Sequence, residues 1–146
     1  MIKCEGKQNP RCLMRRAILG LSVSLFSFPA AAECWVADRL EGYSATSFAD
    51  YKFIEDSFSA GMRICFDGDS GSVTGNDLPL LRIGESTLLG YSTNQMGLET
   101  VNVYQIDRAN RTLLFTQSRI GTSSVTTALP DYAATFIGTV RRDGAD

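Results

Sequence analysis

Histidine is absent from the 146-residue chain. Ser-His-Asp and Cys-His catalysis both use an imidazole as the base, so neither mechanism is available to this protein. Imidazole-ligated metals and histidine acid–base chemistry are excluded for the same reason. We therefore expect no catalytic residue of these classes, and no cofactor held by histidine.

An excess of positive charge is also missing. The chain has 14 Lys+Arg and 16 Asp+Glu, which gives a formal net charge of -2. Nucleic-acid-binding domains normally carry a basic face, so no nucleic-acid partner is expected. With 44% hydrophobic and 21% charged residues, the composition is that of one folded domain rather than a disordered chain.

A long apolar run, too, is lacking. Residues 14–32 read MRRAILGLSVSLFSFPAAA, with two arginines, about 12 apolar residues and then small residues. This order predicts a secretory signal helix over residues 1–32, cleaved after Ala32. The apolar run is shorter than the roughly 20 residues of a membrane span, so no stable span is expected after cleavage. Met14 would begin a compact signal, so translation can start there or at Met1.

Residues 33–146 are expected to form a single β-rich domain. Removal of residues 1–32 takes away five basic residues and one acidic residue, and changes the net charge from -2 to -6. Lys52 is the only lysine that remains. Such an acidic surface repels nucleic-acid phosphates and anionic lipids.

Few cysteines remain after cleavage. Of the four in the chain, Cys4 and Cys12 precede Ala32, and only Cys34 and Cys65 follow it. A pair of cysteines in an exported protein predicts a disulfide and a periplasmic or secreted location. No C-x-x-C motif is present for redox exchange. Trp35 follows Cys34 directly, and we expect its ring to pack against the disulfide.

Short runs rich in β-branched and aromatic residues alternate with Gly, Asn, Asp and Ser clusters. This pattern is typical of strands and tight turns, and no long helical patterns lie between them. The spacing predicts an all-β, mainly antiparallel fold, a small barrel or sandwich of about 7–8 strands. The predicted strands lie at residues 52–56, 62–67, 72–74, 79–84, 86–93, 100–107, 112–119 and 134–141.

Two segments have mixed patterns. Residues 45–54 can form a short helix or an edge strand, and the sequence favours neither. Pro130 suits the first position of a helix and Asp131 suits its first turn, which predicts a helical turn over residues 129–134.

The clearest hairpin joins residues 101–106 to residues 112–117 through a polar loop. Asp107 is expected to cap the loop backbone and Arg108 to pair across strands. Asn110 is predicted to take the left-handed conformation, where glycine is often found. Both faces of this hairpin carry apolar residues, so we expect either a covered second face or a barrel that binds something apolar.

The tetrapeptide Gly68-Asp69-Ser70-Gly71 resembles the sequence around the nucleophile of chymotrypsin-like serine proteases. That chemistry needs a histidine base, which this chain does not contain. We interpret the four residues as the turn of a hairpin that follows Cys65.

Three acidic residues lie close together in the sequence, Asp67, Asp69 and Asp77, and are weak calcium candidates. An Asp-x-Asp-x-Gly pattern opens some calcium-binding loops. The later ligands of that pattern are missing, because positions 71 and 78 are Gly and Leu. Ordinary turn residues are therefore the preferred interpretation, and no metal site is expected.

Taken together, the sequence favours an exported, non-enzymatic β-domain that binds an unknown small molecule or envelope protein. The alternative is a small carboxylate- or metal-dependent hydrolase. In outline such a chain resembles lipocalin-like and lysozyme-inhibitor-like barrels of the bacterial periplasm. That resemblance is architectural and transfers no functional residue.

Overall fold

The computed structural model describes residues 32–59, 61–95, 97–121 and 129–144. The predicted signal segment before residue 32, and the choice between Met1 and Met14, lie outside these ranges. The elements, in chain order, are β1 (Glu33–Ala37), β2 (Leu40–Thr46), the 3-10 helix η1 (Ser47–Ala49), β3 (Ile54–Phe58), β4 (Met62–Asp67), β5 (Ser70–Val73), β6 (Asn76–Gly84), β7 (Thr87–Thr93), β8 (Leu98–Asp107), β9 (Thr112–Gly121) and β10 (Tyr132–Arg142).

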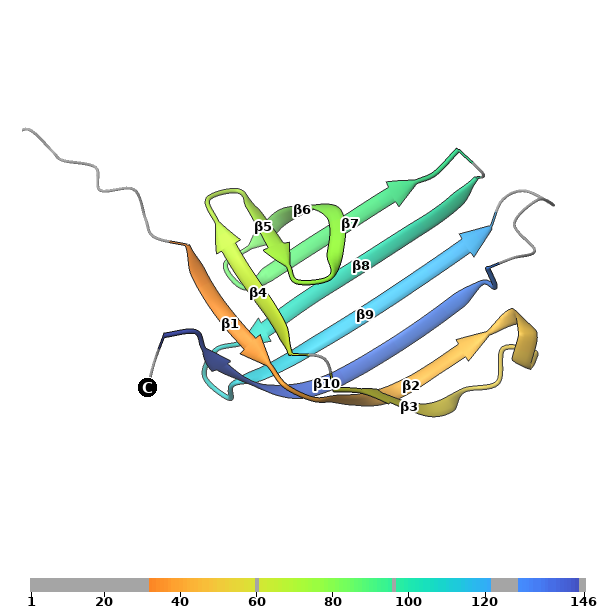
Figure 1. Cartoon of the computed structure of the whole chain (residues 1–146), viewed down its shortest axis with the longest axis horizontal. Coiled ribbons are helices and arrows are strands. Elements are labelled where there is room, and N and C mark those ends of the chain that lie inside the picture. Colours follow the sequence, from red (N-terminus) through yellow and green to blue (C-terminus); the bar gives the residue numbers. More distant parts are fainter. Residues whose placement is uncertain (1–31, 60, 96, 122–128, 145–146) are drawn as a thin grey trace, which may run out of the picture.

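Antiparallel strands close into an eight-stranded barrel (Figure 1). The ring runs β1-β4-β5-β6-β7-β8-β9-β10 and returns to β1 through the β1–β10 pairing. The expected all-β fold is confirmed, and it is a barrel rather than a sandwich. Closure gives each strand of the ring two neighbours and so removes the exposed sheet edges that open sheets have.

The two remaining strands, β2 and β3, lie outside this ring. Only Asp38 and Arg39 separate β1 from β2, and both strands pair with β10. β3 then pairs with β2, which forms the β2–β3 hairpin over residues 40–58. Figure 1 shows this hairpin running along β10 beyond the part of the barrel that β1 and β4 complete.

Side chains from every strand of the ring fill the barrel interior. Alternate residues of a strand point to opposite faces, so one residue in two enters the lumen. On β8, Tyr104 and Ile106 are buried, whereas Val101 and Val103 on the other face are only half-buried. The main core cluster contains Trp35, Ala37, Leu40, Ile64, Phe66, Val73, Leu80, Leu88, Tyr104, Ile106, Leu113, Phe115, Ala134, Phe136 and Val140.

Aromatic rings link three neighbouring strands inside the barrel. Tyr104 stacks on Phe115 with ring centroids 4.7 Å apart, and Phe115 stacks on Phe136 at 5.9 Å. Phe58, at the end of β3, contacts Phe136 edge-on at 5.1 Å. Such pairs stabilise by about 0.5–1.5 kcal/mol beyond the area they bury. Phe58 therefore anchors the β2–β3 hairpin to the core.

A charged cluster lies at the end of the barrel where β1 begins. The Glu33 carboxylate accepts hydrogen bonds from Arg108 Nη2 at 2.6 Å and from Trp35 Nε1 at 3.1 Å. The guanidinium groups of Arg82 and Arg108 lie 5.4 Å and 6.0 Å from the centroid of the Phe66 ring. Arg108 does not pair across the β8–β9 hairpin as predicted, because its ion-pair partner is Glu33 of β1, 75 residues away in the sequence.

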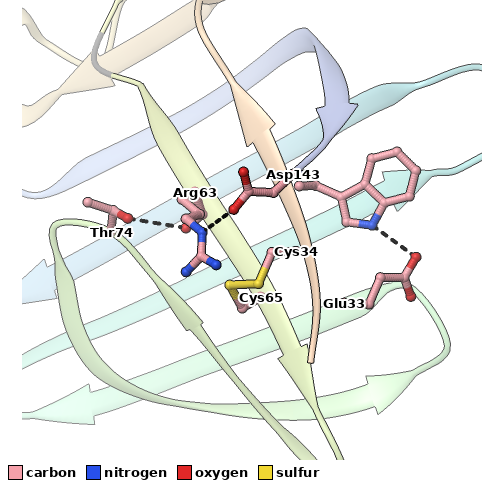
Figure 2. Close-up of a disulfide and its surroundings, with 7 residues drawn as sticks. Glu33, Cys34, Arg63, Cys65, Thr74 and Asp143 are labelled. Carbon is pink, nitrogen blue, oxygen red and sulfur yellow. Dashed lines mark hydrogen bonds and ion pairs between the residues drawn. A yellow bond between two sulfur atoms is a disulfide. The ribbon is translucent and has the colours of Figure 1, made fainter. Parts of the chain in front are cut away.

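The predicted disulfide joins Cys34 to Cys65, which lie directly opposite each other on β1 and β4 (Figure 2). An ion pair between Arg63 Nε and Asp143 Oδ2, 2.6 Å long, lies beside it. Trp35 does not pack on the disulfide as expected. Adjacent side chains of a strand point to opposite faces, so the indole of Trp35 enters the core while Cys34 points outward.

Two further local predictions need correction. No helical turn forms over residues 129–134, because Tyr132 already pairs with β9 and β2 at the start of β10. In the β8–β9 turn the left-handed residue is Arg111, with φ 52°, and not Asn110. Asp107 does cap this turn, since its carboxylate accepts the Ala109 and Asn110 N–H groups at 3.0 Å.

Helix is scarce in the described residues. The segment over residues 45–54 contains the end of β2, the short helix η1 and the start of β3. Within the described part of the chain, no helix has the length and apolar character needed to cross a membrane.

Reduction of the disulfide is expected to lower the free energy of unfolding by about 3–4 kcal/mol, because the bond restricts the unfolded chain. The two cysteines are 31 residues apart in the sequence. Urea unfolding with and without a reductant measures the difference. A Cys34→Ser, Cys65→Ser variant is the control, since the reductant should not change its midpoint. Equal midpoints for the oxidised and reduced wild-type protein would contradict this prediction.

Candidate functional site

The strand β3 has an open edge in the described part of the molecule. Among the described strands β3 pairs with β2 alone, so its other side offers unpaired backbone groups. The Ser57 N–H donates to Asp56 Oδ1 at 2.8 Å and therefore points away from β2. In an antiparallel ladder this direction alternates, so the Glu55 N–H faces the same open edge.

A groove of about 680 Å³ lies beside this edge, on the outer face of the hairpin. Tyr43 and Ile137 supply its apolar part, and each is about half exposed. The groove is lined by Arg39, Glu41, Gly42, Tyr43, Glu55, Asp56, Ser57 and Ile137. The residues come from β2, β3, β10 and the short link before β2, so pairing brings them together from distant parts of the sequence.

The groove carries net negative charge. Arg39 and Glu41 form an ion pair of 2.9 Å, but both side chains are well exposed, so the pair contributes little to stability. Glu55 and Asp56 are the other two charged residues of the lining. Adjacent residues of a strand point to opposite faces, so Glu55 faces the groove while the Asp56 carboxylate bonds the edge N–H of Ser57. A cationic side chain placed in the groove would therefore meet the Glu55 carboxylate beyond the Arg39–Glu41 pair.

Close packing of β2 on β10 forms the floor of this surface. A Cβ atom added at Gly42 would collide with the carbonyl oxygen of Thr135, so only glycine fits between the two strands there. On the inner face Ser44 is buried. Gly42 thus sets how closely the hairpin follows β10.

Asp131 fixes the turn of the hairpin to the end of β9. Its Oδ1 accepts the Gly121 N–H at 2.8 Å, and its Oδ2 accepts the Tyr51 hydroxyl at 2.7 Å. The Ser47 N–H also donates to the Asp131 carbonyl oxygen at 3.1 Å. The Gly121 N–H, followed by the Tyr51 hydroxyl, lowers the pKa of the Asp131 carboxyl because both bonds favour its charged form.

The inner face beyond the aromatic stack is polar, and its groups bond to one another. Gln117 Nε2 donates to Asn102 Oδ1 at 3.0 Å. Arg119 donates from Nε to the Pro130 carbonyl oxygen, and its guanidinium lies 5.6 Å from the centroid of the Tyr132 ring. Asn102 is buried, whereas Gln117, Arg119 and Tyr132 are half-buried.

The weak calcium candidates do not form a cluster. Asp67, Asp69 and Asp77 are all exposed. In the ranges that the structure describes, no group of three or more Cys, Asp or Glu residues could hold a metal ion. Gly68 and Asp69 form the turn between β4 and β5, as the interpretation of the Gly68–Gly71 tetrapeptide as a hairpin turn implied.

Sequence reasoning did not identify the hairpin surface. β2 mixes Glu41, Gly42 and Ser44 with apolar residues and has no clear period of two. The one available signal is Phe48-Ala49-Asp50-Tyr51-Lys52-Phe53, which places three aromatic residues in a polar segment. The groove itself depends on strand pairing that no local pattern indicates.

The Gly121 amide signal is expected to titrate with Asp131, at a pH below the ordinary aspartate value of about 3.9. A carboxyl whose folded pKa is lowered contributes stability above its unfolded pKa, and this contribution disappears as the pH falls through the folded value. Nuclear magnetic resonance of the amide against pH gives the midpoint. Asp131→Asn should abolish the titration. A midpoint at or above the ordinary value would show that the bonds to Asp131 are not formed in solution.

Comparison with known proteins gives no match for this chain. No family model matches the chain, and neither a curated protein nor a solved structure matches it.

Proposed function

We propose that the protein is an exported, non-enzymatic binding domain that takes an extended, basic segment of a partner protein on the open edge of β3. The partner strand would add to the sheet and place alternate side chains over the groove. The open edge with the acidic groove beside it is the observation that carries this proposal. Strand addition is a common mode of peptide recognition, because the backbone gives affinity and the flanking pockets give specificity.

Export rests on two features. The predicted signal peptide would direct the chain out of the cytoplasm. The Cys34–Cys65 disulfide requires an oxidising compartment such as the periplasm or the extracellular space to persist. Both features agree with a partner that is itself exported or exposed at the cell envelope.

A filled barrel favours recognition on the surface over a ligand held inside. Trp35, Leu40, Phe66 and Phe136 are among the core residues, and each is less than a tenth exposed. Barrels that enclose a ligand leave an open lumen, whereas here side chains occupy it. The β2–β3 hairpin carries the groove and the open edge on one element.

The carboxylate of Asp56 gives this edge a charge requirement. In the free protein it accepts the Ser57 N–H, which occupies the donor that a partner strand needs. A basic side chain on the partner would pair with Asp56 and leave the N–H to a partner carbonyl oxygen. Charged side chains on edge strands also limit self-association, so the same residue disfavours neutral or acidic strands.

The mature chain's charge supports a basic partner. Residues 33–146 carry a formal net charge of -6, so a cationic segment is attracted over distances longer than the contact itself. No comparable observation favours the hydrolase alternative, since Asp67, Asp69 and Asp77 are exposed residues of strands and turns.

A synthetic peptide of alternating lysine and valine is expected to bind at β3. The measurement is a titration of isotope-labelled protein by nuclear magnetic resonance, with the amides of Glu55 and Ser57 shifting most. A glutamate–valine peptide of equal length tests the charge requirement and should not bind. Shifts that map mainly to another face of the barrel would refute the proposal.

Two variants separate backbone pairing from charge. Ser57→Pro removes an N–H that does not bond to β2, so the hairpin should persist while strand addition is blocked. Glu55→Lys should weaken binding by about tenfold, roughly 1.4 kcal/mol. Asp77→Lys, at an exposed acid on β6, is the matched control and should bind like the wild type. Unchanged binding by Ser57→Pro would exclude strand addition.

A further inference from the structure

The turn of the β2–β3 hairpin presents a group of large apolar side chains to solvent. Phe48, Tyr51, Phe53 and Ile54 are 73%, 56%, 66% and 55% exposed, and we call them the aromatic tip. Phe48 lies on η1, Tyr51 and Phe53 lie on the loop that follows it, and Ile54 begins β3, at the far end of the hairpin (Figure 1). Single exposed apolar residues are common, but four within seven positions mark an interaction surface.

The aromatic tip is held in one conformation. The Tyr51 N–H donates to the Thr46 carbonyl oxygen at 2.9 Å, and the Tyr51 hydroxyl donates to Asp131 Oδ2 at 2.7 Å. Asp50 and Tyr51 both have positive φ, 52° and 57°. A left-handed conformation is costly for a bulky residue such as tyrosine and persists only where neighbouring contacts enforce it.

Four backbone donors of the loop form hydrogen bonds within the protein. The N–H groups of Ser47, Asp50, Tyr51 and Lys52 all donate to carbonyl oxygens of the protein, at 2.9 to 3.3 Å. Unbonded backbone groups are costly to move into a medium that cannot hydrogen-bond. These four groups can therefore leave water without losing a hydrogen bond.

The charged residues of the loop indicate which kind of lipid headgroup it would contact. Asp50 and Lys52 are exposed and of opposite sign, and they flank Tyr51. A zwitterionic phospholipid headgroup offers a phosphate to Lys52 and an ammonium group to Asp50 and to the aromatic faces. An anionic bilayer offers only the first of these and repels a domain with a formal net charge of -6.

We propose that the aromatic tip inserts into the headgroup layer of a bilayer made of zwitterionic phospholipid. Aromatic side chains together with a lysine are the residues enriched at this interface. The four exposed side chains lie at the end of a hairpin, where they can enter a deformable lipid layer. This inference uses residues other than the groove and does not depend on the proposed peptide partner.

Vesicle co-sedimentation tests the inference with the folded domain. The protein is expected to sediment with phosphatidylcholine vesicles and to bind less when phosphatidylglycerol replaces half of that lipid. The double variant Phe48→Ser, Phe53→Ser should bind vesicles about tenfold or more weakly, because it lacks the two rings that would be buried in the lipid. The matched control is Leu81→Ser with Ile83→Ser, at positions on β6 that are 57% and 55% exposed, and it should bind like the wild type.

A fluorescent reporter gives an independent measurement. The emission of Phe48→Trp should shift to shorter wavelength when phosphatidylcholine vesicles are added, while Ile83→Trp should show no shift. Absence of sedimentation, equal loss in the tip and control variants, or binding only to anionic vesicles would each overturn the inference. So would a change in oligomeric state in the tip variant, since the aromatic tip would then be covered by a second copy of the chain.

Discussion

The pairing of β10 with two strands at once is the constraint on which the rest of the structure depends. Its C-terminal part pairs with β1 and closes the barrel, and its N-terminal part pairs with β2. β1 pairs with β10 over residues 140–142, and its other side pairs with β4. The division forces the β2–β3 hairpin out of the ring and leaves β3 as an open edge.

Closure of the barrel also explains why its interior is packed. Eight short strands enclose a space that is just wide enough for side chains. Phe115 and Phe136 occupy the middle, and Phe58 reaches this stack from β3. The hairpin is therefore outside the ring in its hydrogen bonding but inside the core through one aromatic side chain. An element held in this way can present a rigid surface although half of its backbone edge is unpaired.

Much of the fold could be predicted from the sequence, because turn residues and β-branched runs are local signals. The strands after Met62 agree closely with the predicted runs. The Cys34–Cys65 bond was indicated by the two cysteines that remain after the predicted cleavage. β1 and β2 were not predicted, because their positions depend on long-range pairing. Gly42 is unfavourable in an isolated strand, yet the approach of Thr135 requires it.

Tertiary contacts also override local preference at the turns. Pro130 and Asp131 are residues typical of a helix start. The Asp131 carboxylate instead accepts hydrogen bonds from Gly121, 10 residues earlier in the sequence, and from Tyr51, 80 residues earlier. In the β8–β9 turn Asp107 bonds two successive N–H groups, so the left-handed residue comes one position later, at Arg111. The candidate site could not be predicted for the same reason, because its residues meet only through pairing.

The two exposed features of the β2–β3 hairpin, its open edge and its aromatic tip, differ in the state of their backbone N–H groups. At the edge, the Asp56 carboxylate occupies the Ser57 N–H, so an uncharged strand gains little by pairing there. At the turn, four backbone N–H groups are already bonded, and large apolar side chains meet the solvent beside Asp50 and Lys52. The edge favours an ordered strand whose basic side chain can pair with Asp56 and so free the Ser57 N–H. The turn, with bonded N–H groups and exposed apolar side chains, favours a lipid surface instead. Because the two features lie on different parts of one hairpin, the occupant of one need not displace the occupant of the other.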